Sequence, residues 1–165
     1  MLCILVGLLL LFSGCGYHLE GGGYIYQGVS RVGVEVFENK TSQTRAGIDF
    51  TNELIREIQE RTDTKVVDPA NAARRIKGVV KAITFSILSR SSTETVVERR
   101  VTAVMDVQLL DTDDDVLWSV SNFSSSESYM VDEDTINDEA SINEAIEIIA
   151  QRIAQRVVSQ MMVNF

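Results

Sequence analysis

The sequence predicts an α+β fold: a two-layer sandwich in which a mainly antiparallel sheet of about four strands carries two helices on one face. Two segments, 75–88 and 96–110, alternate apolar and polar residues with the period of two that a half-buried strand requires. Two others, 45–60 and 141–161, repeat their apolar residues every three or four positions, as amphipathic helices do. The order of these elements along the chain places both helices on one side of the sheet.

The first strand and the first helix are predicted from two short apolar patterns. A strand is expected over residues 31–37, and its buried face is formed by Val32, Val34 and Val36. A polar turn follows, and a helix is expected over residues 45–60. Its apolar stripe consists of Phe50, Leu54, Ile55 and Ile58. Residues 64–67 then form a short strand that ends before Pro69, because proline has no N–H group to donate to a ladder.

Three further segments are predicted to form an antiparallel meander. The alternation within residues 75–88 changes phase, so we expect a β-bulge near Ala82 or Ile83. Residues 96–110 have the clearest alternation in the chain, and the third strand is expected over residues 116–120.

The C-terminal part is predicted to be polar and mobile over residues 121–137 and helical after that. Ser141 and Glu144 have the spacing of a capping box, which marks the start of a helix. The apolar residues behind this cap form one stripe: Ile142, Ile146, Ile149, Ile153, Val157 and Met161. Arg152 and Arg156 are expected to lie near the negative end of the helix dipole. The sheet face opposite the helices is left for water or a partner.

The N-terminal residues 1–14 have the form of a secretory signal peptide, because an uncharged apolar run is followed by Ser13 and Gly14. Cys15 comes next. This arrangement resembles the bacterial lipobox, in which the signal is removed just before a cysteine that then receives lipid on its sulfur and its amino group. The main alternative is an uncleaved membrane anchor, but a spanning helix needs about 20 apolar residues, and this run is shorter.

We therefore expect three regions along the chain. They are a lipoprotein signal peptide (1–14), a lipidated tether rich in glycine and tyrosine (15–29), and a single domain (30–165). Acyl chains on Cys15 would hold the mature protein at a bilayer surface, since each buried methylene contributes about 0.8 kcal/mol. No cofactor is expected apart from this covalent lipid.

Charge and residue chemistry argue against two functional classes. The net charge of -9 argues against a general role in nucleic-acid binding, which needs clustered cations and a favourable overall field. The single histidine, His18, falls in the expected tether, where acid–base catalysis has no framework. Residues 111–115 are rich in aspartate but lack the glycine of a calcium loop, so they indicate a solvated turn. We find no enzyme active site and no metal site in the sequence.

Cations are concentrated in one part of this acidic chain. Seven of the 15 Lys and Arg residues lie between positions 74 and 100. One interpretation is a solvated sheet face that is kept soluble by its charge. The other is a phosphate-binding surface, in which Lys77 and Lys81 share one face of a strand and are approached by arginines of its hairpin neighbour. The candidate anion-binding residues are Lys77, Lys81, Arg90, Arg99 and Arg100.

With anchor, tether and sandwich in place, the chain resembles the LptE family of lipopolysaccharide-assembly lipoproteins. The most specific similarity is in residues 13–19, Ser-Gly-Cys-Gly-Tyr-His-Leu, followed by residues 34–41, Val-Glu-Val-Phe-Glu-Asn-Lys-Thr. The order of elements is similar over nearly the whole mature chain.

The resemblance implies a lipoprotein of the Gram-negative outer membrane that sits in the lumen of the LptD barrel. It would assist assembly of that barrel and help deliver lipopolysaccharide to the outer leaflet. The implied partners are an LptD-like β-barrel, lipopolysaccharide and, through the palmitate-type lipid on Cys15, the membrane. Gly16 after this cysteine is consistent with outer-membrane sorting. The basic strands would then be the candidate contact for the phosphates of lipid A.

An alternative of a different class is a lipoprotein subunit of a curli-type, CsgG-like secretion channel. Such subunits also follow a lipidated cysteine with a valine-rich strand and a Phe-x-Asn-x-Thr turn, which here is residues 37–41. They form rings of identical copies, so stoichiometry separates the two interpretations. A solute-binding or enzymatic lipoprotein would need a convergent polar pocket that the sequence does not indicate.

Overall fold

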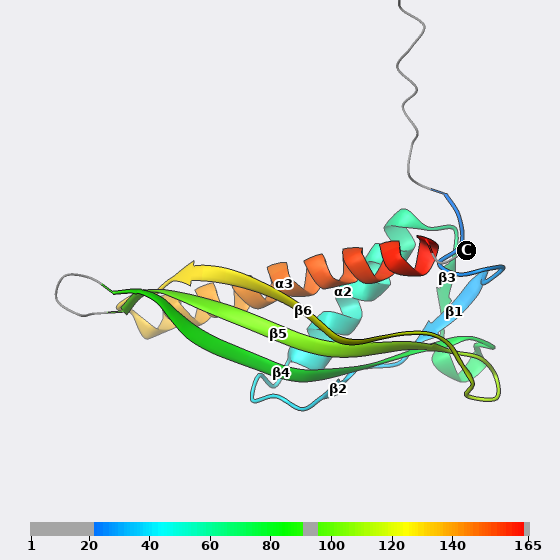
Figure 1. Ribbon diagram of the computed structural model, residues 1–165, viewed down its shortest axis with the longest axis horizontal. Helices are drawn as coiled ribbons and strands as arrows, with labels where there is room; N and C mark the ends of the chain where they lie inside the picture. The colour runs from blue at the N-terminus through cyan, green and yellow to red at the C-terminus, as the bar shows by residue number, and fades with distance from the viewer. Residues whose placement is uncertain (1–21, 91–95, 164–165) are drawn as a thin grey trace, which may run out of the picture.

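The structure, a computed structural model, describes residues 22–90 and 96–163. The predicted signal peptide, Cys15 and His18 lie outside the described residues. Within these described ranges, six strands form one sheet: β1 (Arg31–Val34), β2 (Glu38–Asn39), β3 (Lys65–Val67), β4 (Arg75–Arg90), β5 (Val96–Leu110) and β6 (Val116–Met130). The helices α2 (Ala46–Arg61) and α3 (Thr135–Val163) lie on the same side of this sheet (Figure 1). The predicted α+β class with two helices on one face is confirmed.

The predicted sheet of about four mainly antiparallel strands is wrong in strand number and partly wrong in direction. In the described part of the chain the sheet has six strands and is mixed, in the order β3-β1-β4-β5-β6, with β2 also paired to β4. β1 is parallel to both β3 and β4, and β2 is parallel to β4. The crossover through α2 makes β3 parallel to β1. The chain then crosses β1 over residues 68–74 and enters β4 in the same direction. Local alternation identifies strands but does not reveal their partners.

The expected strand over residues 31–37 is interrupted, so that β1 and β2 are two separate pieces along the same edge of β4. Phe37, between them, turns into the core and is 3% exposed. Its ring lies against Gly78 of β4, where a Cβ atom would come within 2.7 Å of a ring carbon. Glycine is therefore required at this position, because any side chain would occupy the space of the Phe37 ring.

The meander β4-β5-β6 is antiparallel, as predicted. The bulge in β4 falls between Val80 and Ala82, next to the predicted position. The third strand is much longer than expected, because β6 continues to Met130 through the segment predicted to be mobile. A second bulge beside Asn122, which has φ +54°, shifts the alternation. Serines on the exposed side of the strand give this segment its loop-like composition.

The C-terminal helix begins earlier than its capping-box pattern indicates. α3 starts at Thr135, so Ser141 and Glu144 lie inside the helix rather than at its N-terminus. The predicted apolar stripe is correct in register: Ile149 is fully buried and Met161 has no exposed area. Neither described helix contains an apolar run long enough to cross a membrane.

One hydrophobic core lies between the sheet and the helices. Along β5, buried residues alternate with residues that are half-buried or exposed. The buried side of the sheet faces the helices and is called the helix face below. The opposite side is called the outer face. Full burial of each large aliphatic or aromatic side chain contributes roughly 1.5–3 kcal/mol. The largest fully buried members of the core include Phe50, Ile25, Ile58, Ile76, Met105, Leu109, Ile149, Ile153 and Met161.

The described part of the predicted tether, residues 22–29, packs against this domain. Ile25 has no exposed area, and its backbone N–H donates to Thr64 Oγ1 at 3.0 Å. The Thr64 hydroxyl in turn donates to the carbonyl of Val29 at 2.8 Å. Residues 22–29 are therefore packed as part of the folded domain.

Candidate functional site: a charged and hydroxyl-rich sheet surface

Lys77, one of the predicted anion-binding cations, is held in ion pairs within the chain itself. Its Nζ lies 3.5 Å from Asp114 Oδ1 and 3.8 Å from Glu35 Oε1. Arg75 shares both partners, at 2.7 Å from Asp114 and 3.6 Å from Glu35. This network holds the turn after β5 against the start of β4. An anion at Lys77 would therefore compete with two carboxylates.

Lys81 is the extra residue of the β4 bulge, and its side chain joins β4 to β6 across β5. Its Nζ donates to Asn122 Oδ1 at 2.7 Å and lies 3.3 Å from Asp106 Oδ2. Asp106 also accepts the Asn122 backbone N–H at 2.6 Å. The two bulges are thus connected by one lysine, one aspartate and one asparagine on the outer face.

The remaining three predicted cations lie toward the other end of the β4–β5 hairpin. Arg100 stands opposite Ser86 in register and shares its outer face, whereas Arg99 stands opposite Ile87 on the helix face. Arg90 is the last residue of β4. Lys81 reaches Asp106, and Asp106 and Arg100 are six positions apart on β5, about 20 Å at the usual rise. The five cations therefore do not form one compact anion site.

Between the two charged ends, the outer face is covered by small hydroxyl side chains. The register aligns Thr84 of β4 with Thr102 of β5 and Ser126 of β6. Further hydroxyl residues on this face are Ser86, Ser119, Ser124 and Ser128. These side chains are short, and their hydroxyl groups both donate and accept hydrogen bonds. Sequence reasoning missed this surface, because the serines of β6 were interpreted as a loop.

The free edge of β6 is occupied by two arginines of α3. Arg152 Nη1 donates to the carbonyl of Ser126 at 2.7 Å, and Arg156 Nη1 donates to that of Ser124 at 3.1 Å. Arg152 also pairs with Glu127 at 2.7 Å. The Arg156 guanidinium lies 4.3 Å from the centroid of the Phe123 ring, a cation–π contact. The predicted placement of these arginines at the negative end of the helix dipole is wrong, because α3 continues to Val163 and has no basic residue in its last turn. They bind backbone groups of an edge strand instead.

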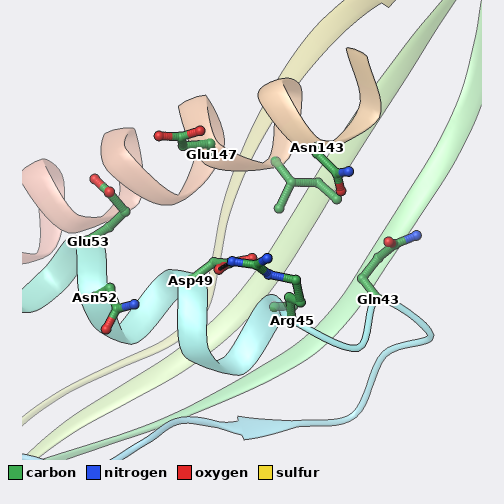
Figure 2. Close-up of a pocket in the computed structure, with 9 residues that line it drawn as sticks. Gln43, Arg45, Asp49, Asn52, Glu53, Asn143 and Glu147 are labelled. Atoms are coloured by element: carbon green, nitrogen blue, oxygen red, sulfur yellow. Dashed lines mark hydrogen bonds and ion pairs between the residues drawn. The ribbon is translucent and has the colours of Figure 1, made fainter. Parts of the chain in front are cut away.

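A polar cleft of about 340 Å³ opens where α2 and α3 diverge (Figure 2). Asp49 and Glu53 of α2 line it, together with Glu147 and Asn143 of α3. Arg45 is the lining cation, and it lies 3.4 Å from Asp49, with which it is drawn in contact in Figure 2. The carboxylates give this cleft a negative field, which is unsuited to phosphate groups.

Glu53 Oε2 also accepts a hydrogen bond from Nη2 of Arg56, on the next turn of α2. This hydrogen bond, with the negative charge of Glu53, raises the pKa of the Arg56 guanidinium above its ordinary value. Arg56 therefore stays charged on the exposed face of the helix. Within residues 22–90 and 96–163, no group of three or more His, Cys, Asp or Glu residues is placed to hold a metal ion.

Several solved structures share this fold. Lipoprotein B from Nitrosomonas europaea is 20% identical, with a TM-score of 0.61, over 85% of this chain and 86% of that chain. Rare lipoprotein B from Shewanella oneidensis is 13% identical, with a TM-score of 0.51, over 79% and 92%. A PelC dodecamer from Paraburkholderia phytofirmans is 16% identical, with a TM-score of 0.51, over 88% and 95%. At these identities the similarity shows the fold alone.

Sequence comparison identifies the family. No curated protein sequence matches the chain significantly. The profile of the LptE family, described as lipopolysaccharide-assembly, matches residues 29–161, which is most of the chain and nearly all of the described domain. The family is a non-enzymatic family of envelope-associated lipoproteins. This chain therefore belongs to the LptE family of lipopolysaccharide-assembly proteins.

Proposed function

We propose that this protein is an outer-membrane lipoprotein, anchored through lipid on Cys15, that plugs an LptD-like β-barrel. In this role it assists assembly of the barrel and helps deliver lipopolysaccharide to the outer leaflet. The observation that carries the proposal is the family match over residues 29–161. The lipobox-like residues 13–15 lie a short distance before it in the sequence.

The outer face of the sheet supports a role inside a barrel. The lumen of an outer-membrane barrel is polar, because its lumen-facing side chains alternate with lipid-facing ones. A surface bearing Thr84, Thr102 and Ser126 offers hydrogen bonds without the bulk of long side chains. The opposite side of the molecule exposes the charged surface of α2 and the acidic cleft. The hydroxyl-rich face is therefore the side we assign to the barrel wall.

Purification from outer membranes tests this proposal. The protein with a C-terminal affinity tag is expected to copurify with one large β-barrel at one-to-one stoichiometry. A Cys15→Ser variant is the matched control, since loss of the acylated sulfur should release the protein from the membrane fraction. Recovery of a symmetric ring of identical copies without a barrel would contradict the proposal and support the curli-type alternative. The PelC structure with a similar fold is a dodecamer, so a ring of identical copies is an outcome that this experiment has to distinguish.

The outer-face cations are the proposed contact for the phosphates of lipopolysaccharide. Lys77, Lys81 and Arg100 share this face, so we expect the triple glutamine variant to retain several-fold less lipopolysaccharide. Glutamine keeps a hydrogen-bonding side chain and avoids adding repulsion to Asp106 and Asp114. A matched control replaces Arg31 and Lys65, exposed cations of β1 and β3, with glutamine. Equal retention by the triple variant and this control would remove these three residues from the proposal. Arg90 and Arg99, at the hairpin end, are tested as a separate pair.

A further inference from the structure

The edge of β4 is covered along its first part and open along the rest. β1 and β2 pair with it as far as Val80, whose carbonyl accepts the Lys40 N–H at 2.9 Å. Beyond Val80, no strand of the described chain pairs with β4 on the side away from β5. We call residues 81–90 the open edge. Residues 84–88 within it are all exposed.

The backbone groups available on the open edge follow from the register. Ile76 and Val80 stand opposite Leu109 and Met105 of β5. Their carbonyls accept the backbone N–H groups of Glu35 and Lys40, the residues that follow β1 and β2. After the bulge, Ile83, Phe85 and Ile87 stand opposite the same alternating set of β5 positions. Their backbone N–H and C=O groups therefore point away from β5, as those of Ile76 and Val80 do. These groups are therefore in position to hydrogen-bond to an added strand.

Apolar side chains accompany these unused backbone groups. Phe85 is 40% exposed, Ile87 48% and Leu88 39%, although the equivalent positions of β5 are buried or half-buried. Phe85 stands opposite Val101, so its side chain projects on the helix face. It lies at the margin of that face, because α3 packs over β5 and β6. An added strand with apolar residues on that face would extend the core over Phe85 and Ile87. Backbone pairing and side-chain burial would then act together.

Charge decides between a second copy and another protein as the occupant. The charged side chains of the open edge are Lys81 and Arg90, one at each end, and the segment contains no carboxylate; Lys81 also lies 3.3 Å from Asp106 Oδ2. Pairing two β4 edges would bring like-charged strands together, which is unfavourable at strand distances. A strand that carries carboxylates near its ends would complement the same cations. The open edge is therefore matched to an acidic partner.

We propose that the open edge of β4 is a β-augmentation site for an extended segment of a protein partner. That segment alternates apolar residues, which cover Phe85 and Ile87, with polar ones, and it carries acidic residues toward its ends. The site differs from the outer face assigned above to the barrel wall, so it does not depend on the proposed function. Main-chain hydrogen bonds supply the attachment, and the apolar and acidic side chains supply the selectivity.

The test uses the full mature protein in detergent and a defined probe. The probe is a synthetic peptide of alternating valine and threonine with glutamate at both ends. Binding is followed by peptide fluorescence anisotropy and by hydrogen exchange of the backbone amides. Added peptide is expected to slow exchange at Ile83, Phe85 and Ile87 and to leave the β6 amides unchanged. A peptide with lysine at both ends is expected to bind at least about tenfold more weakly, because it repels the β4 cations.

Two variants separate the backbone from the side chain. Phe85→Ala removes the ring but keeps the N–H group, whereas Phe85→Pro removes both, and an edge strand accepts proline where its N–H faces outward. The proline variant is expected to bind the peptide about fivefold more weakly than the alanine variant, the effect of one lost amide hydrogen bond. Unchanged exchange within β5 shows that each variant has folded.

Three results would overturn the proposal. One is protection of β6 instead of β4, and another is equal binding by the alanine and proline variants. The third is a dimer that protects Ile83, Phe85 and Ile87 without peptide, which would assign the edge to a second copy. Binding by the acidic peptide with the expected variant order supports it. Failure here would leave the barrel copurification result unaffected, because that experiment reads a different surface.

Discussion

At one edge of the sheet, arginines of α3 bind the backbone carbonyls of β6. At the other edge, the open edge of β4 (residues 81–90) is not paired with any strand of the described chain. The Arg152 and Arg156 bonds to Ser126 and Ser124 occupy groups to which a foreign strand would otherwise bind. On β4, the corresponding groups at Phe85 and Ile87 are free of any strand in the described chain. The fold thus protects one edge with its own side chains and leaves the other accessible.

This difference indicates why the two edges differ in composition. β6 is rich in serine, and its protection comes from a different element, so the strand itself needs no charge to discourage pairing. β4 carries its own cations and its bulge, which are the usual local protections of an edge. These reject another basic strand but attract an acidic one. Selective protection of this kind is what a specific docking edge requires.

The covered part of β4 is expected to show the largest effect on stability. Gly78→Ala places a Cβ against the Phe37 ring, which is buried and cannot move without disturbing the core. We expect a loss of about 1–3 kcal/mol in the free energy of unfolding, measured by urea denaturation. Ser86→Ala, on the open part of the same strand, is the control and should change it by no more than about 0.5 kcal/mol. Similar losses in both variants would contradict the contrast between the two parts.

Removing the β6 protection is expected to have an intermediate effect. Arg152→Ala with Arg156→Ala removes two charge-assisted hydrogen bonds, an ion pair and a cation–π contact, all partly exposed to water. We expect a loss of about 1–2 kcal/mol together with concentration-dependent self-association in sedimentation experiments. Arg45→Ala, an exposed arginine just before α2, controls for the lost charge. A double variant that stays monomeric would show that these arginines do not protect the edge.

Charges added to the open edge are expected to change stability least. Phe85 and Ile87 are 40% and 48% exposed, so replacing both with lysine should cost less than about 1 kcal/mol by thermal or urea unfolding. The same variant should bind the valine–threonine peptide several-fold more weakly, because Phe85 and Ile87 no longer offer apolar side chains to its valines. Ile136→Lys, at a 78% exposed position on α3, should leave peptide binding intact. Retained binding by the double lysine variant would argue against an apolar contribution at this edge.

Much of the fold follows from local patterns in the sequence. The helix predicted over residues 45–60 is α2 at Ala46–Arg61, and the strand predicted over residues 96–110 is β5 with the same bounds. Both patterns are long and regular, so burial of one face determines the structure. The patterns failed over residues 121–137, where a bulge at Asn122 breaks the alternation and serines face the solvent. A strand with a small polar exposed face resembles a loop in composition.

The candidate surface was only partly predictable. The concentration of cations on β4 and β5 is evident in the sequence, and so is the shared face of Lys77 and Lys81. Their ion-pair and hydrogen-bond partners are not evident, because Asp114 and Asn122 are far away in the sequence: 37 and 41 residues from the lysines they contact. The separation of Arg99 from Arg100 onto opposite faces follows from the alternation of β5 alone, because neighbouring residues of a strand point to opposite sides.

Taken alone, the sequence determined the α+β class, the apolar stripes of both helices, the alternation of β5 and the cysteine motif that indicates lipid attachment. These are local properties, because a helix or a half-buried strand records its environment in residues a few positions apart. Only the tertiary structure decided that β1 runs parallel to β4 and that one sheet edge is bound by arginines while the other is open. Arg152 and Arg156 bind carbonyls 26 and 32 residues away. Such contacts depend on how the elements are placed in space, and no repeat in the sequence records that placement.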